Sequence, residues 1–125
     1  GQTPHHIVQL NRNNEYVNRS KAVLERCHIG INDAENGVAL WGTANSQVTQ
    51  SGHPGREAAR TTGTYHAGYI HSLESDKRIC ELLESAEKYA IDNKLSDNLK
   101  DNYVRKQLQK IGTEIESGRW NNSTH

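Results

Sequence analysis

The chain contains no Phe and no Met in 125 residues, so its core must be built from aliphatic side chains. Leu, Ile and Val together number 23, and 33% of the residues are hydrophobic. A core of this size suits one ordinary domain and leaves little material for a second. Disorder from low hydrophobicity usually needs a high net charge, but 15 basic residues here balance 15 acidic ones. We therefore expect one small folded domain over residues 1–125.

The composition also argues against several classes of protein. No stretch approaches the 18 apolar residues of a membrane helix, so we expect no membrane insertion by this domain. The two cysteines, Cys27 and Cys80, are too few for a disulfide scaffold and lack the spacing of a structural zinc site. Zero net charge disfavours a domain that holds nucleic acid by a large basic surface. It leaves room for a metal-dependent nuclease, because a bound cation supplies its own charge.

The seven histidines are unevenly distributed. Five of them fall in the first 66 residues: His5, His6, His28, His53 and His66. His71 follows shortly, whereas the last 54 residues contain only His125. This asymmetry predicts a catalytic first part over residues 1–73, a helical scaffold over 74–120 and a frayed tail over 121–125.

The first half of the chain reads as two strands joined through a helix. Residues 5–10 are a strand candidate with two β-branched side chains, and the apolar spacing over 15–27 fits one face of a helix. Asn36-Gly37 is the commonest tight-turn dipeptide and lies between 29–36 and 38–41, which predicts a hairpin there.

Helices dominate the second half. We expect a loop rich in Gly, Ser and Thr over residues 42–62. A helix capped by Thr62 or Thr64 is expected to carry His66 on its inner face, and the apolar pattern of that face continues through Ile79, Leu83, Ala86 and Ala90. A last helix starts at Ser96 and ends near Gly118. We expect these helices to pack over the hairpin, which gives an α+β fold.

His5 and His6 are the residues most suited to chemistry. Neighbouring side chains on a strand point to opposite faces, or diverge where the strand begins, so one histidine can bind a metal while the other binds a water. The ordinary pKa of histidine, about 6.5, lets it remove a proton from water near neutral pH. Two histidines near a terminus are by themselves more often a solvated pair, so the surrounding sequence has to decide.

That surrounding sequence resembles the AHH nucleases of the HNH/endonuclease VII superfamily, the His-Me finger nucleases. The resemblance covers about the first 73 residues: 5–8, then the segment 30–40 around Asn36-Gly37, then 51–54 and 65–66. The pair is preceded by Pro4 here, where the family has alanine. The resemblance implies a ββα-metal core, in which an antiparallel hairpin and a helix hold one divalent cation, with additional helices that are mostly C-terminal.

The resemblance also implies how the roles are distributed. His6 is the general base and His5 a metal ligand, while Asn36 orients the base or assists the metal. The remaining ligands lie on or just before the helix, which points to His53 and His66. The family usually has two such ligands close together, whereas the segment 55–64 separates them here.

Three further residues and the cation complete the predicted site. Arg56 and Arg60 are expected to bind substrate phosphates. An equally weighted alternative is that they are two solvated surface charges. Tyr65, which is next to His66 in the chain, is expected to orient the ring of this histidine. The cation is expected to be Mg²⁺, with Mn²⁺, Ni²⁺ and Zn²⁺ as alternatives.

The predicted function is a metal-dependent endonuclease that cuts double-stranded DNA and leaves a 5′-phosphate. The resemblance implies a toxin domain of a bacterial polymorphic toxin or type VI secretion effector. Such a domain is carried by a larger parent polypeptide, secreted by the producer, active in the cytoplasm of the target cell and neutralised by a cognate immunity protein. Two alternatives remain open: an RNase with the same site, and a non-enzymatic interaction module stabilised by zinc.

Overall fold

The computed structural model describes residues 3–42, 65–66 and 72–120. Its elements, in chain order, are β1 (Thr3–His6), α1 (Glu15–Arg26), the 3-10 turn η1 (Ala34–Asn36), β2 (Gly37–Gly42), β3 (Tyr65–His66), α4 (Leu73–Asp92) and α5 (Asp97–Glu116). This mixture of helices with a small sheet confirms the α+β class.

The sheet has the order β1-β2-β3, with β2 in the centre. β1 runs antiparallel to β2, and His6 lies opposite Gly37. β3 runs parallel to β2, and His66 lies opposite Gly42. The backbone pairing continues one step past β1, because Ile7 N donates to Asn36 O at 2.8 Å.

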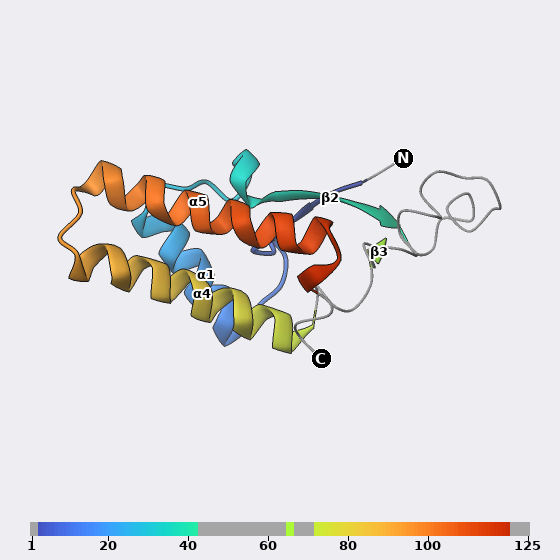
Figure 1. Cartoon of the computed structure of the whole chain (residues 1–125). Helices are drawn as coiled ribbons and strands as arrows, with labels where there is room; N and C mark the ends of the chain where they lie inside the picture. The colour runs from blue at the N-terminus through green and yellow to red at the C-terminus, as the bar shows by residue number, and fades with distance from the viewer. Residues whose placement is uncertain (1–2, 43–64, 67–71, 121–125) are drawn as a thin grey trace.

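The three helices lie against one another beside the sheet (Figure 1). α4 packs against both α1 and α5, and α5 also contacts η1 and β2. A Cβ atom added to Gly112 of α5 would lie 3.2 Å from Ile7 Cδ1 and 3.3 Å from Val38 Cγ1, tighter than ordinary contact. The missing side chain at Gly112 therefore lets α5 approach the strands closely, which offsets the weak helix propensity of glycine.

Each helix begins at a polar cap. The side chains of Asn14, Ser72 and Ser96 accept hydrogen bonds from backbone N–H groups in the first turns of α1, α4 and α5. Gly118, just beyond α5, has a φ of 82°, a left-handed conformation that glycine adopts without strain. The start and end predicted for the last helix are thus confirmed.

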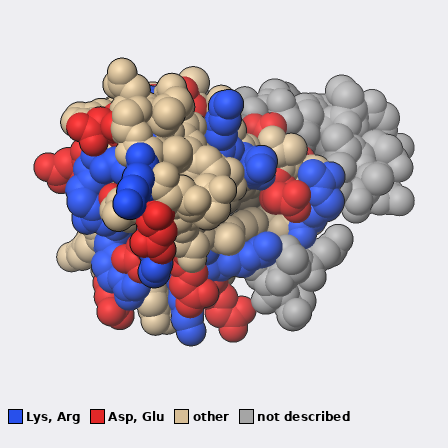
Figure 2. Space-filling view, turned by 60° about the vertical axis from the view of Figure 1, so that its left-hand side comes forward, with Lys and Arg blue, Asp and Glu red and all other residues tan. Residues whose placement is uncertain are grey.

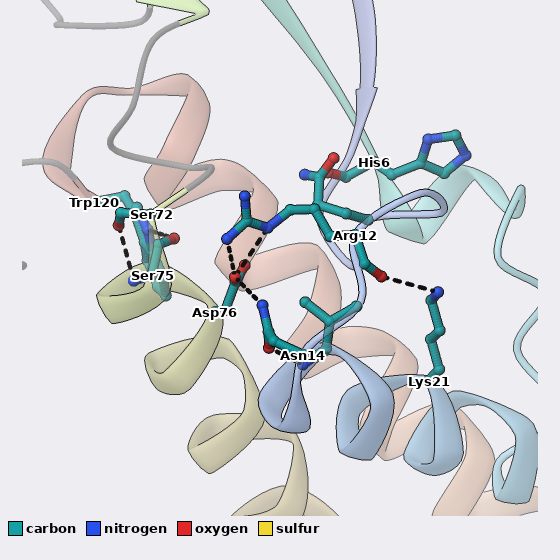
Figure 3. Close-up of polar contacts among 10 residues, drawn as sticks. His6, Arg12, Asn14, Lys21, Ser72, Ser75, Asp76 and Trp120 are labelled. Atoms are coloured by element: carbon teal, nitrogen blue, oxygen red, sulfur yellow. Dashed lines mark hydrogen bonds and ion pairs between the residues drawn. The ribbon is translucent and has the colours of Figure 1, made fainter.

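The core is aliphatic, with one tryptophan. The largest fully buried apolar side chains are Trp120, Leu24, Leu83, Leu108, Val23 and Val104. Trp120 ties the end of the described chain to α4, because its indole Nε1 donates to Ser75 Oγ at 2.9 Å (Figure 3). The guanidinium of Arg78 lies 4.0 Å from the centre of the Trp120 ring. Cys27 and Cys80 are buried free thiols.

A buried carboxylate joins the loop before α1 to α4. Asp76 Oδ2 accepts from Arg12 Nη2 at 2.6 Å, from Arg12 Nε at 3.0 Å and from Asn14 Nδ2 at 2.9 Å (Figure 3). Asp76 is 2% exposed, so these bonds replace the water that its charge would otherwise bind. The same contacts fix the direction in which the chain leaves β1.

The predicted hairpin between 29–36 and 38–41 is wrong. Residues 34–36 form η1 instead, and the antiparallel partner of β2 is β1, which precedes α1 in the chain. Asn36-Gly37 looked like a hairpin turn, but the Asn36 side chain is buried and bonds to other segments. Long-range pairing therefore prevails over the local turn preference at this dipeptide.

Two element boundaries also differ from the prediction. The first strand ends at His6, four residues earlier than expected, because Ile7 and Val8 turn into the core. α4 begins at Leu73 rather than before His66, and Tyr65–His66 pair with β2 as a strand. The buried face predicted for this helix, Ile79 to Ala90, is confirmed.

Within the described residues, none of the helices combines the length and the apolar character needed to cross a membrane.

Candidate active site

His5 and His6 are the last two residues of β1, not the first two of a strand. Their backbones lie opposite Val38 and Gly37 at the start of β2. Both histidines line one pocket of about 300 Å³, whose wall consists of His5, His6, Asn32, Asp33, Ala34 and Gly37. Both residues contribute to the wall of this pocket, and the divergence of their two side chains stays a prediction.

The His6 ring is held by a side chain from the loop before η1. Its Nε2 lies 2.8 Å from Asn32 Oδ1. The backbone carbonyl of His6 accepts from Gln9 Nε2, which fixes the turn that follows β1. The ring points away from the Arg12–Asp76 cluster (Figure 3), so the buried carboxylate of Asp76 is not a partner of this histidine.

Asn36 stabilises the backbone around the pair. Its Oδ1 accepts from Val8 N at 2.8 Å, and its Nδ2 donates to Val8 O at 3.1 Å and to Ile31 O at 2.8 Å. The side chain is fully buried, and its two bonds to Val8 are shielded from water, while the bond to Ile31 is partly buried. Asn36 therefore holds the segment after the histidines against the loop that carries Asn32. A direct role toward the base or the metal stays a prediction.

Asp33, another residue of the pocket wall, is tied to α5. Arg105 Nη1 lies 3.1 Å from Asp33 Oδ2 and 3.3 Å from Glu35 Oε2. Asp33 also accepts from Gly30 N at 2.8 Å. The Gly30 N–H and the Arg105 guanidinium lower the pKa of Asp33 below its usual value. This carboxylate is therefore charged and engaged at neutral pH.

The other predicted site residues either lie outside the described residues or are far along β2 from His6. His53, Arg56 and Arg60 lie outside the described residues, and their roles stay predictions. The backbone of His66 lies opposite Gly42, at the far end of β2 from the residue that faces His6. At about 3.3 Å per residue, the five steps along β2 span about 16 Å. Metal binding by His66, and its orientation by Tyr65, stay predictions.

The described part of the chain contains only some of the side chains predicted to bind the metal. It holds no group of three His, Cys, Asp or Glu side chains that could bind an ion together. His5 has the chemistry of one ligand, because an imidazole nitrogen binds divalent transition metals. Its Nε2 is buried, and the residue is part of the pocket wall. Residues 3–42 thus fit a metal centre as the source of one ligand and its neighbouring base.

Acidic and basic side chains are interspersed on the face of the molecule drawn in Figure 2. Several of the basic groups are paired with carboxylates, such as Arg19 with Glu84 and Arg26 with Glu87. This distribution agrees with the zero net charge of the whole chain.

Sequence reasoning missed two residues that shape this site. Asn32 and Arg105 are 26 and 99 positions from His6, and no spacing rule connects residues so far apart. The available signal for Asn32 was its place four residues before Asn36, in a short polar segment. Arg105 looked like any exposed basic residue of an amphipathic helix.

Comparison with known proteins identifies the family. The AHH family, described as a nuclease family of the HNH/ENDO VII superfamily with conserved AHH, matches residues 1–115. Neither the curated proteins nor the solved structures contain a significant match. The match covers the histidine pair, Asn36, α1, α4 and all but the last residue of α5, and so the chain belongs to the AHH nuclease family of the HNH/ENDO VII superfamily.

Proposed function

We propose that this nuclease is a metal-dependent endonuclease that hydrolyses phosphodiester bonds of double-stranded DNA, with His6 as general base and His5 as a metal ligand. The observation that carries the proposal is that both histidines line one pocket while Asn32 holds the His6 ring. A base and a cation site within one cavity are what hydrolysis of a phosphodiester requires.

The chemistry assigned to His6 is removal of one proton from water. The proton moves to a ring nitrogen of His6 as the water oxygen forms a bond to phosphorus. The bond from phosphorus to the 3′ oxygen breaks, and that oxygen takes a proton from solvent. The products are a 5′-phosphate and a 3′-hydroxyl, and His6 returns its proton to water. Base catalysis of this kind contributes about 10²- to 10⁴-fold in rate.

Nucleases of this family generally use a divalent metal, and we assign one of its ligands to His5, which is part of the pocket wall. In the proposal, His53 and His66 supply further ligands to the same cation, and the strands and helix that carry the ligands form a ββα-metal core. A divalent cation, Mg²⁺ or alternatively Mn²⁺, Ni²⁺ or Zn²⁺, would neutralise charge on the phosphate oxygens. Asn36 would maintain the backbone that follows the two histidines, through its bonds to Val8 and Ile31.

The proposal also includes a biological role for the domain as a toxin. The domain would act as an antibacterial toxin, delivered by a larger parent polypeptide into the cytoplasm of a target cell and inhibited in the producer by an immunity protein. What supports this is the resemblance of the histidine and Asn-Gly segments to toxin nucleases. Induced expression in a bacterial host should stop growth, and His6→Ala should relieve the effect. Normal growth with active enzyme in the lysate would refute the toxin role.

The test of the activity is cleavage by the purified protein. Supercoiled plasmid and folded RNA are incubated with Mg²⁺, Mn²⁺, Ni²⁺ or Zn²⁺, beside a sample in EDTA. The proposal predicts plasmid cleavage with metal and none in EDTA. Cleavage of RNA alone would replace DNA with RNA as the substrate. Absence of cleavage, together with unfolding in EDTA, would indicate a structural metal and refute the enzyme.

A further inference from the structure

The contact between His6 and Asn32 determines which ring nitrogen can accept a proton. Asn32 Oδ1 is an amide oxygen, which accepts hydrogen bonds and has no proton to donate. His6 Nε2, 2.8 Å away, must therefore carry the hydrogen of this bond. A neutral imidazole has one protonated nitrogen, so the lone pair of His6 is on Nδ1.

Asn32 is braced on both sides. Ile31, immediately before it, accepts from Asn36 Nδ2 at 2.8 Å through its carbonyl. Asp33, immediately after it, accepts from Arg105 Nη1 at 3.1 Å. The first brace comes from a fully buried side chain and the second from α5, so the backbone that carries Asn32 is tied to the core from two directions.

The bond itself lies at an exposed position, and this matters for its role. Water competes with an exposed hydrogen bond, so the loss of this bond changes the free energy of unfolding little. The contact therefore has little value for stability. Its value is in orientation, since Asn32 and His6 form adjoining parts of the same pocket wall.

We propose that Asn32 is a positioning residue of the nuclease, which holds His6 in the tautomer protonated on Nε2 and turns Nδ1 toward the water to be activated. The proposal rests on the proposed role of His6 as general base. It assigns orientation of the base to Asn32, at the pocket surface, and stabilisation of the backbone to Asn36, in the core.

Kinetics of plasmid cleavage test the proposal. Asn32→Leu keeps the approximate size of the side chain and removes the acceptor, and it should lower kcat about 10-fold or more with little change in KM. Asn32→Asp keeps an acceptor oxygen at the same place and should restore most of kcat. Asn18→Leu changes an exposed asparagine on α1 and should behave as wild type. Wild-type kcat in Asn32→Leu would overturn the proposal, and so would an Asn32→Asp variant as slow as Asn32→Leu.

Nitrogen NMR of the histidine rings gives a readout that does not depend on activity. In the metal-free protein, at a pH where His6 is neutral, wild type and Asn32→Asp should both show a protonated Nε2 and an unprotonated Nδ1. Asn32→Leu should show a mixture of the two tautomers. A wild-type ring protonated on Nδ1 would overturn the proposal even if the protein cuts DNA. Conversely, a protein that cuts no nucleic acid but shows the expected tautomers would refute the proposed function alone.

Discussion

Replacing Asn36 by alanine removes a fully buried side chain that makes three hydrogen bonds to the backbone. Each bond contributes about 1 kcal/mol net, and a buried backbone group left without a partner costs about 1–3 kcal/mol. Water can partly replace these bonds in the enlarged cavity, so we expect the free energy of unfolding to fall by about 3 kcal/mol. That is a large fraction of the roughly 5–15 kcal/mol typical of a small domain.

The measurement is urea unfolding of wild type and Asn36→Ala, followed by circular dichroism. The midpoint should fall markedly while the slope stays the same, because the surface exposed on unfolding hardly changes. Asn18→Ala is the matched control, since its side chain is exposed and its amide donates to the exposed side chain of Asn13. It should change stability by about 0.5 kcal/mol or less. A loss below about 1 kcal/mol in Asn36→Ala would refute the structural role that we assign to Asn36.

Three further predictions concern the supporting structure. Arg12→Met should lower stability by about 2 kcal/mol in urea unfolding, because it leaves the buried Asp76 charge without its cation, and adding Asp76→Asn should recover part of the loss. Failure of the second substitution to recover anything would show that the pair is not coupled. Burial raises the pKa of Cys27 from 9.0 to about 11. The contribution of this thiol to the free energy of unfolding should therefore be constant below pH 9 and be lost as the pH rises from 9 to 11, because the thiol ionises in the unfolded chain before it does in the folded one. Cys27→Ala should show a smaller loss over that range, and equal losses would contradict the assignment. Trp120→Phe should cost about 1–2 kcal/mol in thermal or urea unfolding through loss of the bond to Ser75, and unchanged stability would contradict that contact.

The helices were predictable because their signals are local. Ser96 caps α5 and Gly118 follows its end, as their positions in the sequence indicated. The apolar spacing of α4 correctly gave its buried face. Periodicity and capping involve residues within a few positions of one another, so one sequence contains all the information that they need.

The strand pairing could not be read in the same way. Asn36-Gly37 has the strongest local preference for a hairpin turn, yet Asn36 is buried and β2 pairs with β1. The decisive interactions, from Asn36 to Val8 and Ile31, join segments that the sequence separates. Their geometry depends on how α1 and α5 pack, which no local pattern records.

The candidate site likewise contains residues that the sequence indicates and residues that only the tertiary structure brings together. The resemblance placed His5 and His6 together because they are adjacent, and the structure adds that both line one pocket. The resemblance does not indicate Asn32, because the contact of Asn32 with His6 exists only once the loop before η1 is folded against β1. Orientation of a base is a property of tertiary structure, and motif spacing cannot reveal it.

The central claim is that His6 is the base of a nuclease site, and the most direct measurement is plasmid cleavage by His6→Ala beside wild type in saturating metal. The account predicts cleavage at least about 100-fold slower in His6→Ala, with the same circular dichroism spectrum and urea midpoint as wild type. A folded His6→Ala protein that cuts within about threefold of the wild-type rate would contradict it.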